Sequence, residues 1–201
     1  MAAVSHELSS TTPPPPELPR PRTLLVGTAY AILAVAMFFA ALFGIYVQLR
    51  SETLAAGEEW IAEGTISLVP GGMMMLTMAM SVVSMQWAVY AIARDDRPHA
   101  YLALALTALF GVAVINQTVY LYNQMGLVVS ETVPAVLIYT ITGAHLVMLA
   151  AAIAFVGLMA FRALAGQFSS RQADGIAAAA MFWYATVAVY AVIYYAIYIT
   201  K

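Results

Sequence analysis

Residues 132–161, TVPAVLIYTITGAHLVMLAAAIAFVGLMAF, contain no Asp, Glu, Lys or Arg. A helix of roughly 20 apolar residues crosses about 30 Å of hydrocarbon, so this stretch is long enough to span a membrane. Backbone amides in the bilayer core find no water, and only a helix or a closed barrel satisfies them. The stretch lacks the polar alternation of a barrel strand. It therefore predicts a transmembrane helix.

Four further charge-free runs have the same character: 23–49, 64–93, 100–130 and 175–200. The 201-residue chain is 63% hydrophobic and 9% charged, with a mean hydropathy of +0.86, far more apolar than a soluble domain. The sequence predicts an all-α membrane protein, a bundle of five transmembrane helices.

Residues 1–22 differ in composition from the rest of the chain, because they contain SSTTPPPP followed by PRPR. Proline lacks an N–H and fixes φ, so these residues cannot form a regular helix. We predict a disordered, Pro-rich tail over 1–22 and a transmembrane domain over 23–201.

The charged residues between the runs predict the orientation. If the five spans alternate in direction, six Arg residues fall on one side and only Arg50 and Lys201 on the other. The positive-inside rule makes the Arg-rich side cytoplasmic. The N-terminus is then cytoplasmic and the C-terminus outside, with Glu52, Glu58, Glu59, Glu63 and Glu131 on the outer face. The six Arg are Arg20, Arg22, Arg94, Arg97, Arg162 and Arg171.

The composition disfavours several classes of function. A net charge of -2 without a basic stripe argues against nucleic-acid binding. The chain has no Cys, which excludes thiolate metal sites and covalently attached haem. No charged side chain lies inside a span, and such side chains usually mark transport paths. A membrane enzyme or transporter that acts alone is therefore the least favoured interpretation.

Two features in the spans have both a metal-binding and a packing interpretation. His145 could be a haem or metal ligand, or a structural histidine held by a hydrogen bond. A group of Met residues in 64–93 could bind Cu(I), or could fill gaps between helices. Without further His, Cys or carboxylate ligands in the spans, packing is favoured for both. The Met residues are Met73, Met74, Met75, Met78, Met80 and Met85.

Other residues in the spans predict contacts with neighbours. Asn116 and Gln117 should face another helix or subunit, since lipid penalises polar side chains. Trp183 and Tyr184 lie near the cytoplasmic end, beside lipid headgroups. Tyr194, Tyr195 and Tyr198 suit an interfacial aromatic belt. Five glycines allow close helix approach: Gly27, Gly44, Gly111, Gly143 and Gly157.

Five motifs occur in a recognisable order: AVAMFFAALFGIY (34–46), SVVSMQWAVYAI (81–92), INQTVYLY (115–122), YTITGAHLVML (139–149) and MFWYATVAVYAVIYYAIY (181–198). Together they resemble subunit III of the haem-copper oxidases, from about residue 23 to the end. The number of spans matches the short bacterial form, which lacks the first two of seven helices.

The match preserves the apolar skeleton and replaces many polar groups. Val35 stands where the family carries Glu, Tyr120 where its Gln-x-x-Glu-Tyr motif has Glu, and Val187 where its last motif has Asp. Met148 replaces a second His, and Leu121 replaces a Tyr. The resemblance implies lipid or subunit contacts at the matching positions, and at Tyr184 in the place of a His. These candidate residues are His145, Trp183, Tyr184, Trp87, Gln117, Thr142 and Gly143.

The resemblance also implies a function. The chain would be a non-catalytic subunit III of an aa3-type cytochrome c oxidase in the plasma membrane of a bacterium, in the aerobic respiratory chain. Such a subunit binds no cofactor, packs against and stabilises subunit I, and holds phospholipids in a cleft between helix bundles. Haem and copper are expected in the partner subunits. The missing carboxylates motivate an alternative, a lipid-binding or assembly membrane protein that kept the fold but is not an oxidase subunit.

Overall fold

The computed structural model describes residues 22–62, 64–129, 131–168 and 173–200. Within them lie five α-helices, each long and apolar enough to cross a membrane, and no strand. The prediction of an all-α membrane protein with five spans is confirmed. The helices are α1 (Thr23–Ala55), α2 (Leu68–Ala93), α3 (Arg97–Met125), α4 (Val133–Leu164) and α5 (Asp174–Ile193), and α5 continues into a short π-helix, η1 (Tyr194–Ile199).

Local chemistry explains where the helices depart from the charge-free runs. α3 begins at Arg97 and not at residue 100, because Asp96 caps it by accepting from the His99 amide and Pro98 occupies its first turn. It ends at Met125 because Gly126 takes a left-handed conformation with φ 60°. The run from 64 begins as a turn at Gly64, whose φ is 84°.

The first helix continues six residues beyond the predicted end at 49 and stops at Ala55. Charge alone does not end a helix, and the Gln48 amide donates to the Glu52 carboxylate one turn later. At about 1.5 Å per residue, α1 is roughly 50 Å long, more than the hydrocarbon core requires.

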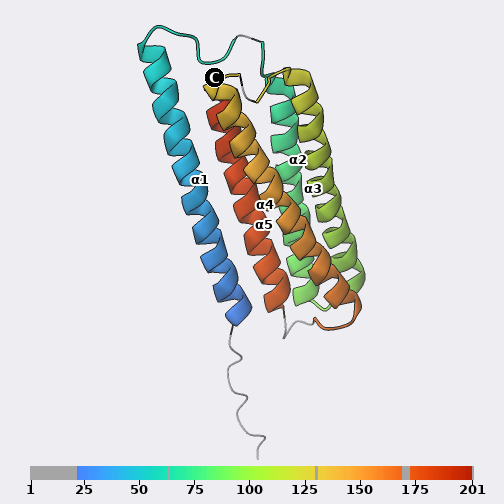
Figure 1. The fold of residues 1–201 in the computed structure, drawn as a ribbon. Coiled ribbons are helices and arrows are strands. Elements are labelled where there is room, and N and C mark those ends of the chain that lie inside the picture. The colour runs from blue at the N-terminus through green and yellow to red at the C-terminus, as the bar shows by residue number, and fades with distance from the viewer. Residues whose placement is uncertain (1–21, 63, 130, 169–172, 201) are drawn as a thin grey trace, which may run out of the picture.

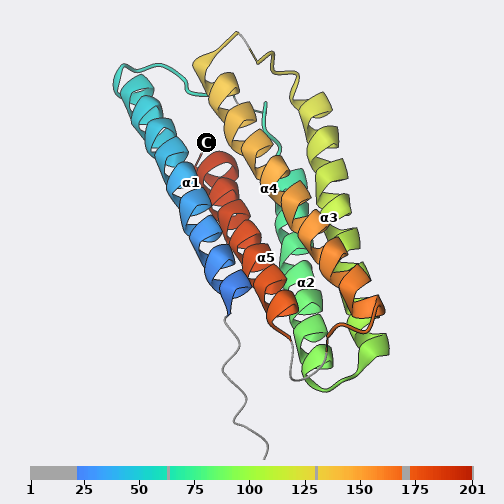
Figure 2. The same cartoon turned by 60° about the horizontal axis from the view of Figure 1, so that its bottom comes forward.

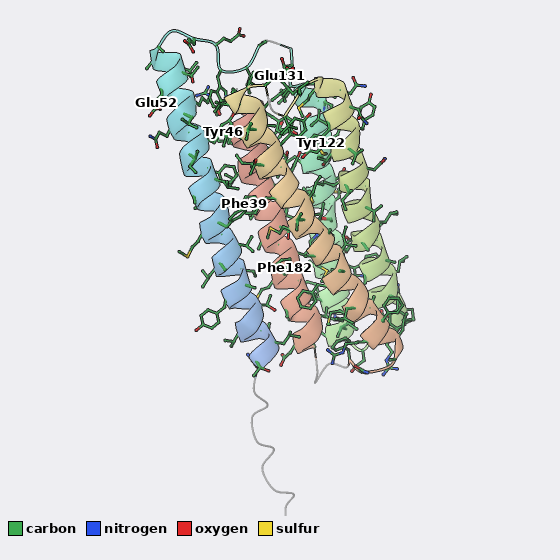
Figure 3. The ribbon with its side chains drawn as sticks, in the orientation of Figure 1. Phe39, Tyr46, Glu52, Tyr122, Glu131 and Phe182 are labelled. Carbon is green, nitrogen blue, oxygen red and sulfur yellow. The ribbon has the colours of Figure 1, made fainter. Side chains whose placement is uncertain are left out.

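The helices run alternately up and down, so the described chain begins and ends at opposite ends of the bundle (Figure 1). The start of α1, the turn from α2 to α3 and the end of α4 lie at one end, with Arg22, Arg94, Arg97 and Arg162. Glu52 and Glu131 lie at the other end (Figure 3). Residues 1–21, which include most of the predicted tail and Arg20, lie outside the described residues, as do Glu63, Arg171 and Lys201.

The helix α5 is the centre of the bundle. It packs against α1, α2 and α4, while α2 and α3 form an extensive pair on one side (Figure 2). In its most apolar stretch 50% of the residues are buried, against 11% in α1. α1 contacts mainly α5 and α4, and most of its surface is open to lipid or to another protein.

Candidate functional site

Trp183 lies at the centre of the bundle and is completely buried. Its indole Nε1 donates to the Ser81 hydroxyl of α2 at 2.9 Å, and that hydroxyl donates to the Met78 carbonyl at 2.6 Å. The Ser84 and Thr107 hydroxyls, 2.7 Å apart, join α2 to α3. Because the bilayer core offers no water, these polar groups are satisfied within the protein, partly by their own helix and partly by a neighbouring one. Trp183 therefore holds helices together, and its ring has no surface exposed to lipid in this chain.

One glycine makes the close packing around Trp183 feasible. A Cβ at Gly111 would lie 2.8 Å from Cη2 of Trp183 and 2.9 Å from Cγ1 of Ile153. The predicted close approach is therefore confirmed at Gly111 on α3.

At the other four glycines this chain alone makes no close approach, so a close approach by another subunit there stays a prediction. No heavy atom of a described neighbour lies within 4 Å of a Cβ built there, because these faces meet no other helix of the bundle. A contact with another subunit at Gly143 stays a prediction. The four are Gly27, Gly44, Gly143 and Gly157.

His145 is buried between α4 and α5. Its Nε2 lies 3.2 Å from the Thr186 carbonyl oxygen. A carbonyl only accepts, so Nε2 is protonated and donates. The ring also lies beside Tyr190, with centroids 5.3 Å apart. No group of three or more His, Cys, Asp and Glu that could hold a metal occurs in the part of the chain that the structure describes. This geometry supports the hydrogen-bonded interpretation.

Thr142 lies one turn before His145 and links α4 to α3. Its hydroxyl is 2.6 Å from the Tyr122 hydroxyl, and it donates to the Ile138 carbonyl in its own helix at 2.6 Å. The Tyr122 ring packs on the Tyr139 ring at 4.8 Å (Figure 3 labels Tyr122). Thr142 is thus a contact between helices of this chain.

Tyrosines at the end of α5 form a packed cluster that the aromatic-belt prediction missed. The Tyr190 hydroxyl donates to the Gly71 carbonyl at 3.1 Å, and the Tyr198 ring lies where a Cβ of Gly71 would be. Tyr198 is buried, so the belt prediction is wrong there, while Tyr195 is exposed and stays consistent with a belt. The π-helix turns Tyr198 inward against α2, a change of phase that regular helical periodicity does not predict.

The methionines of α2 divide between core and surface. Met74, Met78 and Met85 are completely buried, and the Met74 sulfur accepts from the Thr118 hydroxyl at 3.3 Å. Met73 and Met80 are exposed on other faces of the helix. The group does not converge on one point, which supports packing over Cu(I) binding.

Gln117 and Asn116 are neighbouring polar residues of α3, and Gln117 is half-buried. The Gln117 Oε1 atom is buried and has no hydrogen-bond partner among residues 22–62, 64–129, 131–168 and 173–200. Asn116 is exposed. Contact of either side chain with another subunit stays a prediction.

Trp87 lines an open groove along α2, and Tyr184 contacts another residue of its lining, Gln86. The Tyr184 hydroxyl donates to Gln86 Oε1 at 2.7 Å, which ties α5 to the groove. Trp87 is 38% exposed, and its ring lies 5.8 Å from that of His99. The groove has a volume of about 670 Å³ and is lined by Val82, Val83, Gln86, Trp87, Tyr90 and Arg94.

Comparison with known proteins places the chain in a family. The family model for cytochrome c oxidase subunit III matches residues 20–201. The chain belongs to the cytochrome c oxidase subunit III family. It is 29% identical to cytochrome c oxidase subunit 3 of Corynebacterium diphtheriae over 173 residues, 83% of each chain. It is 27% identical to the protein of that name from Bos taurus over 179 residues, 87% of this chain and 69% of the relative. For Pongo abelii the identity is 26% over 185 residues, 90% and 71% of the two chains.

The resemblance drawn from the five motifs is thereby confirmed, and the chain is a multi-pass membrane member of the subunit III family. The three positions that lack the acidic groups implied by the resemblance have different surroundings. Val35 is half-buried against the core, Val187 is buried and Tyr120 is exposed. A carboxylate at Val187 would need a partner inside the bundle, whereas one at Tyr120 would face outward.

Proposed function

We propose that this chain is the non-catalytic subunit III of an aa3-type cytochrome c oxidase in a bacterial plasma membrane. It stabilises subunit I and binds phospholipid, and it has no activity alone. The observation that carries the proposal is the family match over residues 20–201, with a bacterial relative that is covered over 83% of its length. Haem and copper belong to the partner subunits.

The packing of the chain suits this function. Trp183, His145 and Thr142 are engaged in contacts between helices, so they make a rigid bundle and not a reaction centre. α1 offers a long apolar flank, with Tyr30 and Met37 exposed by 70% and 75%. Apolar surface of this extent in a membrane protein suits a neighbouring subunit or ordered lipid.

Co-purification tests the assignment. The chain is tagged, extracted in mild detergent and analysed by absorption spectroscopy and subunit mass. We expect a haem-bearing subunit I to accompany it, and we expect the chain separated from its partners to show no Soret band. A Soret band in the isolated chain would contradict a non-catalytic subunit.

An outcome without subunit I would favour the alternative, a lipid-binding or assembly membrane protein that kept the fold outside the oxidase. The specific observation in its favour is the set of apolar or aromatic side chains at Val35, Tyr120 and Val187. These replace the acidic groups that the resemblance implies.

The orientation is part of the proposal. The bundle end that carries Arg22, Arg94, Arg97 and Arg162 is cytoplasmic, by the positive-inside rule. A cysteine at Ala62, in the loop between α1 and α2, should react with an impermeant thiol reagent in intact cells. A cysteine at Ala165, just after α4, should react only after lysis. The reverse pattern would overturn the orientation.

A further inference from the structure

The groove along α2 has the arrangement of a membrane-facing ligand site. Val83, Trp87, Tyr90 and Arg94 follow at intervals of four, three and four residues, which places them on one face of the helix. All four are exposed, Val83 by 62% and Tyr90 by 57%. Gln86 borders the groove and is held from α5 by Tyr184.

The groove is apolar toward the middle of α2 and positively charged at the end of α2, where Arg94 lies. Val82 and Val83 lie toward the middle of α2, whereas Arg94 caps the helix at the Arg-bearing end of the bundle. From Val82 to Arg94 the helix rises about 18 Å, at about 1.5 Å per residue. One leaflet is about 15 Å of hydrocarbon, half of about 30 Å. The groove therefore extends over one leaflet and not over the whole membrane.

The side chains near the Arg94 end of the groove suit a lipid headgroup. Trp and Tyr prefer the level where hydrocarbon meets headgroups. Tyr90 lies within one turn of the end of α2 and Trp87 within two turns, so both suit that level. The Arg94 guanidinium lies 6.0 Å from the centroid of the Tyr90 ring, which keeps its charge on the groove side of α2. A guanidinium binds phosphate oxygens through two parallel N–H donors.

Among the described residues, no carboxylate forms an ion pair with Arg94. Asp96 is engaged with His99, its Oδ2 atom lying 2.7 Å from Nδ1, and its other oxygen caps α3. Asp95 follows Arg94 directly and turns the chain with φ 58°. Phosphate is the complementary charge for the Arg94 end of a groove whose other walls are mostly apolar.

From this geometry we propose that the α2 groove binds one diacyl phospholipid of the leaflet on the Arg94 side. An acyl chain lies along Val82, Val83 and Trp87, and the phosphate accepts from Arg94. The inference rests on the proposed function, which includes phospholipid binding, and gives that binding a site. The described helices form one bundle, so the site replaces the cleft between bundles that the resemblance implied.

The test counts phospholipids on the tagged chain, purified in mild detergent with whatever subunits accompany it. Native mass spectrometry and phosphorus analysis give the number bound per copy after a fixed detergent wash. We expect Arg94→Gln to lose one phospholipid per copy, and Arg94→Lys to retain it, because lysine keeps the positive charge. The matched control is Arg97→Gln, at the same end of the bundle but outside the groove, which should leave the count unchanged.

A second pair of variants tests the apolar end of the groove. Val83→Trp fills the groove and should also lose one phospholipid. Leu109→Trp, on an exposed face of α3, should not. An unchanged count in both Arg94→Gln and Val83→Trp would overturn the proposal. So would loss of a protein subunit with no loss of lipid, because the groove would then be a protein interface.

The two proposals fail in distinguishable ways. Whether the haem-bearing subunit accompanies the wild-type chain reports on the oxidase assignment. The phospholipid count on the tagged chain reports on the groove, whether or not that subunit is present.

Discussion

Two sides of the bundle are built differently. The interface of α2, α3 and α5 has hydroxyl and indole hydrogen bonds, a glycine under an aromatic ring and side chains with no exposed surface. α1 buries only Thr28, Phe39 and Tyr46 among its 33 residues. Figure 3 labels Phe39 and Tyr46 on α1.

The difference follows from the solvent. Lipid tails are as apolar as Leu, so apolar character alone does not drive one helix against another in a membrane. Close packing and hydrogen bonds are what hold such helices together. The α2, α3 and α5 interface has both, and α1 has few of either within this chain. We infer that α1 depends on lipid or a neighbouring subunit for much of its lateral packing.

Trp183→Ala should have the largest effect on the tight side. It removes the largest completely buried side chain and leaves the Ser81 hydroxyl without its donor. We expect a loss of about 3 kcal/mol in the free energy of unfolding, typical of buried aromatic truncations. Unfolding by sodium dodecyl sulfate in mixed micelles, followed by circular dichroism, measures it. Trp87→Ala, at a half-exposed position, is the control and should lose much less.

Gly111→Ala should have the next largest effect, because its Cβ would collide with Trp183 and Ile153. Overpacking of this kind costs about 1–3 kcal/mol. Gly143→Ala is the matched control and should not destabilise the isolated chain, since its Cβ meets open space and alanine is favoured over glycine inside a helix. If Gly143→Leu nevertheless loosens the chain from its complex, Gly143 faces another subunit. Equal losses for Gly111→Ala and Gly143→Ala in the isolated chain would contradict the packing described above.

The sequence predicts the spans well and the contacts between them only in part. Long charge-free runs determine that helices form, because the membrane permits little else. Periodicity does not reveal which face of such a helix meets a neighbour, since all faces are apolar. Gly111 and Gly143 therefore look equivalent in sequence, although only Gly111 lies under a side chain. The inward turn of Tyr198 depends on a π-helix that has no pattern in the sequence. Ser81 and Thr107 are hydroxyl residues in otherwise apolar helices. Such residues could have predicted the hydrogen bonds between helices around Trp183.

Tyr46→Phe tests the weaker side. The Trp60 Nε1 atom donates to the Tyr46 hydroxyl at 3.2 Å, and the two rings meet edge to face, so this pair ties the loop after α1 back to the helix. Loss of one neutral hydrogen bond costs about 1 kcal/mol. We expect faster proteolysis of the loop at residues 56–62, with little change in global unfolding. Tyr30→Phe, at an exposed position, is the control, and a large global loss for Tyr46→Phe would show that α1 is more tightly integrated than its burial indicates.

The smallest effect should come from Asp96→Asn, at the exposed turn between α2 and α3. The hydrogen bond from the His99 side chain, followed by that from its backbone amide, lowers the pKa of the Asp96 carboxyl below its ordinary value. A carboxyl whose pKa is depressed in the folded state stabilises that state above its unfolded pKa, about 3.9, and loses the contribution as pH falls through the folded pKa. Asn is as good an N-cap as Asp, so the substitution removes the charge and keeps the cap. At pH 7 the variant should therefore melt slightly below the wild type, by an amount that shrinks as salt screens the exposed pair. As the pH falls below the folded-state pKa of Asp96, the two melting curves should converge. A difference that persists unchanged as the pH is lowered through the acid range would mean that Asp96 acts through its shape as a cap and not through its charge.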